Sequence, residues 1–189
     1  MSSKPNDRIL LAAVAADDQA AYKTLFESYY DRLYRLALLV TRSNELSEEI
    51  VSDVFIALWR NRANALEIGN LRVYLYIATR NTALNYQKTL QKKMVVRLDD
   101  LEIDLADPYV NPEQAFITRE MDARIRAAID ALPPRCKMVF KLVKEDGLSY
   151  KEAAEVLGLS VGTVDNQLVI AIKKIASALF YRFSPLSGK

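Results

Sequence analysis

The sequence predicts an all-α protein, in which an acidic, flexible linker joins two small helical domains and the second domain contains a helix-turn-helix. Only 5 Gly and 6 Pro occur among the 189 residues, and 51% of the residues are apolar, which is ample for packed cores. Runs of Ala, Leu, Glu, Lys and Arg recur, and these residues lose little freedom on entering a helix. The apolar residues recur at spacings of three and four, as they do on one face of a helix.

The composition excludes several classes of function. The chain has no His and one Cys, so classical zinc sites, His acid–base catalysis and Cys–His nucleophile pairs are unavailable. We therefore expect a protein that is not an enzyme, with no cofactor, no metal and no small-molecule substrate. Lys and Arg total 26 against 24 Asp and Glu, so nucleic-acid binding would depend on local basic patches.

The apolar segments are too short to suggest a membrane protein. No apolar run approaches the roughly 20 residues that span a bilayer. The first residues, "MSSKPNDRILLAAVAADDQAAY", carry acids within their apolar part, unlike a secretory signal. We expect a cytoplasmic protein in which Cys136 is a reduced, small core residue.

The first domain is expected at residues 9–92. Apolar residues over 9–40 follow a helical spacing and indicate one long helix or two in series. The next helix is expected to start near Ser47, where "SEEI" places a capping Ser before acids that suit a helix N-terminus, and to end near residues 60–62. Residues 61–70, "NRANALEIGN", break the periodicity and predict an ordered loop.

A third helix, over residues 71–92, changes from apolar to basic along one side. That side carries Leu71, Tyr74, Ala78, Asn81, Asn85, Lys88 and Lys92. Residues 72–98 contain no acid, but they contain six Lys or Arg and three Tyr. This stretch is the main local source of positive charge.

The linker is expected at residues 93–112. Its sequence includes the acidic stretch "LDDLEIDLADP", and its two Pro discourage a continuous helix. The second domain follows at residues 113–182. Its first helix is expected to start near Glu113 and to stop before "LPPR", where Pro can begin the next helix.

Residues 147–168, "GLSYKEAAEVLGLSVGTVDNQL", have the spacing of a helix-turn-helix. Ser149 can cap the first helix, Gly158 can take the positive φ of a tight turn, and Ser160 can cap the second helix. The second helix is expected to bury Val164, Leu168, Ala171, Ile175 and Ala178. Its other side then presents Thr163, Asn166, Gln167, Ile170, Lys173 and Lys174 to base edges and phosphates. From spacing alone, an amphipathic hairpin with a solvated polar face remains the alternative.

The chain resembles a family of bacterial transcription proteins at both ends. The stretch "ALPPRCKMVFKLVKEDGLSYKEAAEVLGLSVGTVDNQL" resembles the promoter-reading C-terminal domain of the extracytoplasmic-function (ECF) group of the sigma-70 family of RNA polymerase sigma factors. The stretches "SEEIVSDVFIALW" and "NLRVYLYIATRNTALNYQK" resemble the N-terminal domain of the same group. The resemblance implies an alternative sigma factor that binds core RNA polymerase and directs initiation at specific promoters. It also implies promoter DNA and a membrane-anchored anti-sigma factor as partners.

The resemblance assigns roles to three sets of residues. Docking on core polymerase falls to Glu49, Ser52 and Asp53, with Ser52 in place of the commoner Gln. Contact with the minus-ten element, including capture of a flipped base by the loop, falls to Asn61, Asn64, Asn70, Arg80, Asn81, Asn85, Tyr86, Lys88 and Lys92. Reading of the minus-thirty-five element falls to Ser160, Thr163, Asn166, Gln167, Ile170, Lys173 and Lys174. Family members often carry basic residues where this sequence has Asp165, Ile170 and Ile172. We therefore do not expect this helix to bind phosphates strongly.

Several alternatives stay open on the residues alone. The three docking residues could be a solvated polar face, Asn81 could bond to the backbone within its domain, and residues 88–93 could be a solvated helix end. The outward Val169 and Ile170 could form an apolar patch that a partner covers. A two-domain helix-turn-helix regulator that is not a polymerase subunit would need an α/β receiver domain. An RNA-binding or scaffolding helical protein would not explain both motifs.

Overall fold

The computed structural model describes the backbone of residues 5–94 and 116–180, and the side chains of residues 6–89 and 122–179. All regular structure in these ranges is helical, with no strand, which confirms the predicted fold class. The chain divides into two compact units, and each is described by itself below. Residues 93 and 94 of the expected linker belong to a helix, and residues 95–112 lie outside the described part.

Two helices in series open the N-terminal unit, α1 (Pro5–Ala15) and α2 (Gln19–Thr41). The break between them has a local cause. Asp17 adopts a left-handed φ of 67°, and the Asp18 carboxylate caps α2 by accepting from the backbone N–H of Ala20 at 2.8 Å and of Ala21 at 3.0 Å. Of the two alternatives, one long helix or two, the structure has two.

Helix α3 (Asn44–Arg60) begins three residues earlier than the sequence predicts. Its N-cap is Ser43, whose Oγ accepts from the Leu46 N–H at 3.3 Å. Ser47, the predicted cap, is fully buried inside the helix and donates to the Ser43 carbonyl at 2.6 Å. The prediction was wrong because the chain turns at Arg42, which has a left-handed φ of 55° and ends α2. A helix that starts directly after this turn leaves Ser47 in its first turns.

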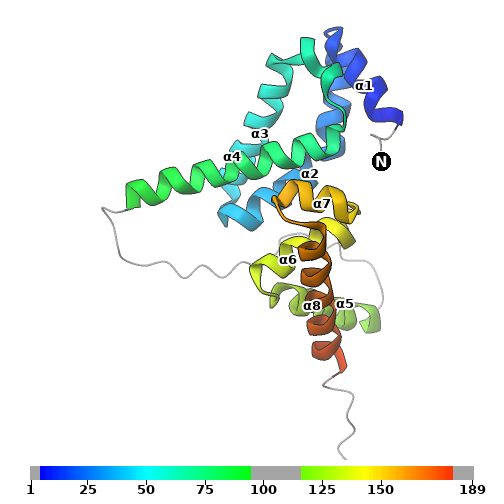
Figure 1. The fold of residues 1–189 in the computed structure, drawn as a ribbon, viewed down its shortest axis with the longest axis vertical. Helices are drawn as coiled ribbons and strands as arrows, with labels where there is room; N and C mark the ends of the chain where they lie inside the picture. The colour runs from blue at the N-terminus through cyan, green and yellow to red at the C-terminus, as the bar shows by residue number, and fades with distance from the viewer. Residues whose placement is uncertain (1–4, 95–115, 181–189) are drawn as a thin grey trace, which may run out of the picture. The chain divides into compact units, whose positions relative to one another are not determined.

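The stretch after α3 is more regular than the loop predicted there. It contains the short 3-10 helix η1 (Arg62–Glu67), which precedes the long helix α4 (Leu71–Met94). Figure 1 shows α4 as the long green helix of this unit. The extent of α4 agrees with the predicted third helix.

Helix α2 lies at the centre of the N-terminal unit. It packs against α1, α3 and α4, and α1 also packs against η1 (Figure 1). The largest fully buried side chains here are Leu11, Leu25, Leu33, Ile50, Phe55, Leu58, Leu71, Leu75 and Tyr76. Each buried side chain of this size stabilises the fold by about 1.5–3 kcal/mol relative to exposure. This core fixes the relative placement of α3 and α4.

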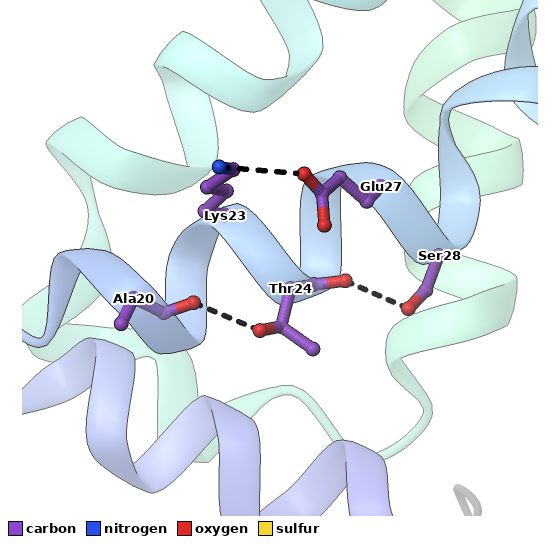
Figure 2. A network of polar contacts seen from close by, with 5 residues as sticks. All are labelled: Ala20, Lys23, Thr24, Glu27 and Ser28. Atoms are coloured by element: carbon purple, nitrogen blue, oxygen red, sulfur yellow. Dashed lines mark hydrogen bonds and ion pairs between the residues drawn. The ribbon is translucent and has the colours of Figure 1, made fainter.

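The solvent-facing side of α2 is polar and satisfies its own groups (Figure 2). The Thr24 hydroxyl donates to the Ala20 carbonyl at 2.9 Å, and the Ser28 hydroxyl donates to the Thr24 carbonyl at 2.7 Å. Lys23 Nζ lies 3.7 Å from Glu27 Oε1, and both side chains are well exposed. Because exposed ion pairs add about 0–1 kcal/mol, the Lys23–Glu27 pair on this solvated face contributes little to stability.

The remaining helices lie after residue 115 of the chain. In chain order they are α5 (Phe116–Asp130), α6 (Pro134–Phe140), the π-helical turn η2 (Lys141–Glu145), α7 (Tyr150–Leu157) and α8 (Val161–Phe180). Helix α8 packs against α5 and α6. Pro134 occupies the first turn of α6, as the "LPPR" stretch predicts.

A small core holds α8 in place. Ile129, Leu132, Cys136 and Ala171 are buried together, and Ile125, Phe140 and Ile175 pack against them. Cys136 is a free, buried thiol, as the sequence predicts. The helix that was expected to start near Glu113 is described from Phe116 onward.

Helices α7 and α8 form the predicted helix-turn-helix. They are bent by 104° relative to each other, within the range of about 90–120° that this motif uses. Ser149 caps α7 by accepting from the Glu152 N–H at 3.2 Å, and Glu152 accepts in return from the Ser149 N–H at 2.8 Å. Gly158 has a φ of 65°, and Ser160 Oγ accepts from the Thr163 N–H at 3.0 Å. All three predicted turn residues are confirmed.

The predicted buried face of α8 is correct except at its end. Val164, Leu168 and Ala171 are buried, and Ile175 is half-buried. Ala178 is exposed, against the prediction. Periodicity identifies a face of a helix, but it does not say how far along that face a neighbouring element extends.

No single helix of the described ranges is long and apolar enough to span a membrane, and α7 with α8 meets that criterion only as the bent pair.

Candidate nucleic-acid interface

The three predicted docking residues share one exposed face of α3. Glu49, Ser52 and Asp53 are exposed, on the side opposite the buried Ile50 and Val54. Glu45 and Glu48 are also exposed, so the outer surface of this helix is acidic. Sequence reasoning missed Ile56, which is 45% exposed and follows Asp53 by three residues, which places it on the same face.

Tyr86 reaches from α4 to this acidic face. Its hydroxyl lies 3.0 Å from Glu49 Oε1 and 2.9 Å from Asp53 Oδ2. The hydrogen bond to Asp53, followed by desolvation and the bond to Glu49, raises the pKa of the Tyr86 hydroxyl, which keeps its proton. A residue predicted for the minus-ten element therefore bonds to two residues predicted for polymerase docking. Nothing local in the sequence indicates these bonds, because 37 and 33 residues separate the partners.

The predicted base-capturing segment is η1 and its flanks. Asn61 and Asn64 are exposed, and the Asn64 Nδ2 donates to the Asn61 Oδ1 at 2.8 Å. Asn70 is half-buried, and its Oδ1 accepts from the Val73 N–H at 3.2 Å at the start of α4. Two of the three asparagines therefore face solvent, and the third caps a helix. Leu66, which the prediction did not include, is 56% exposed beside them.

An arginine holds this segment against the rest of the unit. The Arg62 guanidinium lies 4.7 Å from the centre of the Trp59 ring, and Arg62 also forms an ion pair with Asp17. Tyr22 packs on Trp59 with their ring centres 4.9 Å apart. These contacts give η1 a defined position between α3 and α4.

The second half of α4 presents the predicted polar side to solvent. Asn81, Asn85 and Lys88 are exposed, while Arg80 is half-buried and donates to the Asn81 Oδ1 at 3.4 Å. The contact that Asn81 makes here is with a side chain and not with the backbone. The side chain of Lys92 lies outside the described residues.

The outward face of α8 is mixed in character. Asn166, Ile170, Lys173 and Lys174 are exposed, as is Asp165. Ser160 and Thr163 share a hydrogen bond of 2.8 Å at the N-terminus of α8, where Thr163 is half-buried. Val169, Ile170 and Ile172 are 40–45% exposed, which is the outward apolar character that the sequence indicated.

Gln167 contacts a side chain from another helix. It is half-buried, and its Oε1 accepts from the Cys136 thiol at 3.0 Å. Its amide group therefore has a partner inside the unit. The prediction treated Gln167 as a free member of the polar face, because the partner comes from α6, 31 residues earlier.

Two known families match the chain, one in its N-terminal half and one in its C-terminal half. The family described as Sigma-70 region 2 matches residues 25–93, and the family described as Sigma-70, region 4 matches residues 122–175. The first match spans most of α2, α3, η1 and α4. The second match spans most of α5, the following helices and the helix-turn-helix.

Two named relatives illustrate the sequence likeness. The chain is 30% identical over 175 residues to the ECF RNA polymerase sigma factor SigE of Mycolicibacterium smegmatis, covering 87% of this chain and 66% of that protein. It is 26% identical over 182 residues to the ECF RNA polymerase sigma-E factor of Escherichia coli strain K12, covering 93% of this chain and 95% of that protein.

Solved structures share the fold. CnrH, solved in complex with the cytosolic domain of CnrY, matches with a TM-score of 0.61 at 24% identity, covering 94% of this chain and 99% of that one. The sigma factor RpoE of Bartonella quintana, solved in complex with the anti-sigma factor NepR, matches with a TM-score of 0.58 at 18% identity, covering 84% of this chain and 96% of that one.

Two helical units that match region 2 and region 4 in chain order define the class of this protein, a sigma factor. More narrowly, the chain belongs to the ECF group of the sigma-70 family. The two-domain regulator with a receiver is excluded, because residues 5–94 contain no strand from which an α/β receiver could be built.

Proposed function

We propose that this sigma factor is a dissociable specificity subunit, which binds core RNA polymerase, recognises a two-part promoter and helps to open it. The observation that carries the proposal is the ordered pair of family matches. Each matched unit exposes polar side chains on its helices, on α3 and α4 in the first and on α8 in the second. We further propose functional boundaries at residues 9–92 and 113–182, joined by the acidic linker.

The acidic face of α3 is the proposed docking surface for core polymerase. Exposed Glu49 and Asp53 suit Lys or Arg side chains of a partner. Exposed Ile56 adds apolar area beside them. Ser52 donates to the Glu48 carbonyl at 2.8 Å, so it contributes mainly its shape to this surface.

The segment η1 and helix α4 are the proposed contacts of the minus-ten element. Unstacking a base costs a few kcal/mol, so the pocket that receives it needs groups that can bond to the base. Asn61 and Asn64 can supply amide donors and acceptors. Exposed Asn81, Asn85 and Lys88 follow one side of α4 and can bond to bases and phosphates of the same strand.

Helix α8 is the proposed reader of the minus-thirty-five element. Asn166 suits adenine, Ile170 suits a thymine methyl group, and Lys173 with Lys174 suit phosphates. Asp165 repels phosphates, so this helix alone binds weakly. Tethering to a second DNA-binding unit raises the effective concentration, so neither unit needs to bind tightly alone.

The remaining parts of the proposal concern catalysis, location and regulation. The polymerase forms the phosphodiester bonds, and this subunit catalyses no reaction itself. It acts in the cytoplasm, where the polymerase works. We propose that an anti-sigma factor covers the exposed Val169 and Ile170 when this sigma factor is inactive. By resemblance to the family, this anti-sigma factor is membrane-anchored.

Run-off transcription tests the proposal. Purified core RNA polymerase of the source organism is assayed with and without this protein on a library of the organism's upstream regions. We expect specific start sites that appear only with the protein. We expect Asn81→Ala/Lys88→Ala and Asn166→Ala/Gln167→Ala to lose them. Absence of both transcription and binding to core polymerase would overturn the proposal in favour of a separate DNA-binding protein.

A further inference from the structure

Tyr86 lies on α4 and reaches to the surface of α3. Its ring packs against the buried cluster of Ala37, Ile50 and Ala83. Its hydroxyl emerges from this apolar support and meets Glu49 at 3.0 Å and Asp53 at 2.9 Å. The ring is therefore held by the core, while the hydroxyl lies at the surface of α3.

The two carboxylates need such a support if they are to act together. Glu49 and Asp53 are four residues apart on one helix, and like charges at this spacing repel each other. Exposed carboxylate side chains also lose rotamer freedom when a partner orders them. A rigid phenol O–H lies within hydrogen-bond distance of both carboxylates, and its one proton, shared between the two acceptors, offsets part of their repulsion.

We propose that Tyr86 is a positioning residue of the polymerase-docking surface, which holds Glu49 and Asp53 side by side to receive one guanidinium or ammonium group of the polymerase. The proposal rests on the docking role proposed above for α3. A cation between the two carboxylates replaces their repulsion by two charge-assisted hydrogen bonds. The Tyr86 hydroxyl then serves protein binding instead of the minus-ten contact that the sequence suggested.

Affinity for core polymerase tests this role, measured by fluorescence titration of the labelled full-length protein. Tyr86→Phe keeps the packed ring and removes only the hydroxyl. We expect the dissociation constant to rise about five-fold, which corresponds to about 1 kcal/mol. The matched control is Tyr34→Phe, which removes an exposed hydroxyl that bonds to Asn44 Oδ1 at 2.9 Å, between α2 and α3. The control is expected to bind core polymerase as the wild type does.

A double-mutant cycle separates positioning from simple loss of structure. In the Glu49→Gln/Asp53→Asn background, Tyr86→Phe is expected to change the dissociation constant less than two-fold, because the carboxylates that it positions are gone. An undiminished five-fold effect in that background would overturn the proposal. So would a Tyr86→Phe protein that binds core polymerase like the wild type but opens the promoter poorly, because the hydroxyl would then contact DNA.

The same titration distinguishes failure of this inference from failure of the proposed function. If the wild type does not bind core polymerase, the docking function itself is wrong. If the wild type binds but Glu49→Gln/Asp53→Asn binds equally well, the α3 surface is wrong. If only Tyr86→Phe has no effect, the positioning role is wrong while the docking surface stands.

Discussion

Asp7 and Tyr29 form a buried polar pair at the contact between α1 and α2. Both residues are more than 90% buried, and the Tyr29 hydroxyl donates to Asp7 Oδ2 at 2.8 Å. Burial, followed by the hydrogen bond to Asp7, raises the pKa of the Tyr29 hydroxyl. A buried carboxylate without a hydrogen-bond donor lowers the stability of the fold. The bond from Tyr29 to Asp7 therefore stabilises the contact between α1 and α2.

Removing the hydroxyl is expected to destabilise the protein in a pH-dependent way. At neutral pH, Tyr29→Phe should lower the free energy of unfolding by about 1–3 kcal/mol, because Asp7 loses its buried donor. Above about pH 10 the unfolded chain releases the Tyr29 proton that the folded chain keeps, so the stability of the wild type falls as pH rises. Urea unfolding from pH 7 to 11 should give a shallower fall for Tyr29→Phe, and parallel curves would contradict this expectation.

Gln167 illustrates a limit of residue-level prediction. Its position in α8 placed it correctly beside the polar face, but its partner, the Cys136 thiol, comes from another helix. Because the amide oxygen accepts from the thiol, the amide NH2 group is the part of Gln167 that remains for another partner. Helical spacing alone does not show which polar residue of a predicted exposed face bonds to a neighbouring helix.

At the scale of elements, helix ends were predictable where the capping group and the capped turn lie in one local stretch. Ser149, Gly158 and Ser160 act within three or four residues of themselves, and the structure confirms all three. Ser47 was wrongly predicted as the cap of α3, whose cap is Ser43. The position of this cap depends on where α2 ends, and the packing of α2 against its neighbours decides that end.

The turn between α7 and α8 provides a stability test at this scale. Gly158 has a φ of +65°, and an added Cβ would meet nothing within 4 Å. Gly158→Ala should therefore cost about 1–2 kcal/mol through backbone strain alone. Gly69→Ala is the matched control, because its Cβ would also meet nothing and its φ is not in the left-handed region. Equal unfolding free energies for the two variants would show that the turn tolerates a side chain.

For the whole molecule, weak DNA contacts are expected to add through the polymerase. Lys88 is exposed on the proposed DNA side of α4, while Lys23 is exposed on the solvated face of α2 (Figure 2). Lys88→Ala should weaken promoter binding by the holoenzyme and lower the slope of log K against log salt by about 1. Lys23→Ala should leave both unchanged. A slope equal to that of the wild type in Lys88→Ala would remove this residue from the phosphate contacts.

The sequence by itself determined the helical fold class, the helix-turn-helix and the family. Periodic apolar residues and caps act over three or four positions, so they can be recognised without knowing the rest of the fold. Two separate motifs in the right order are also independent of how the helices pack. The exposed positions of Glu49, Asp53 and Asn166 followed from the same helical spacing.

Only the tertiary structure decided which polar side chains meet. Tyr86 bonds to Glu49 and Asp53 because α4 packs beside α3, and Cys136 bonds to Gln167 because α6 packs beside α8. The same packing decides that Ser47 is buried and that Ala178 is exposed. Such contacts join residues that are far apart in the chain. They depend on the angles and offsets between helices, which side-chain packing sets and local spacing does not encode.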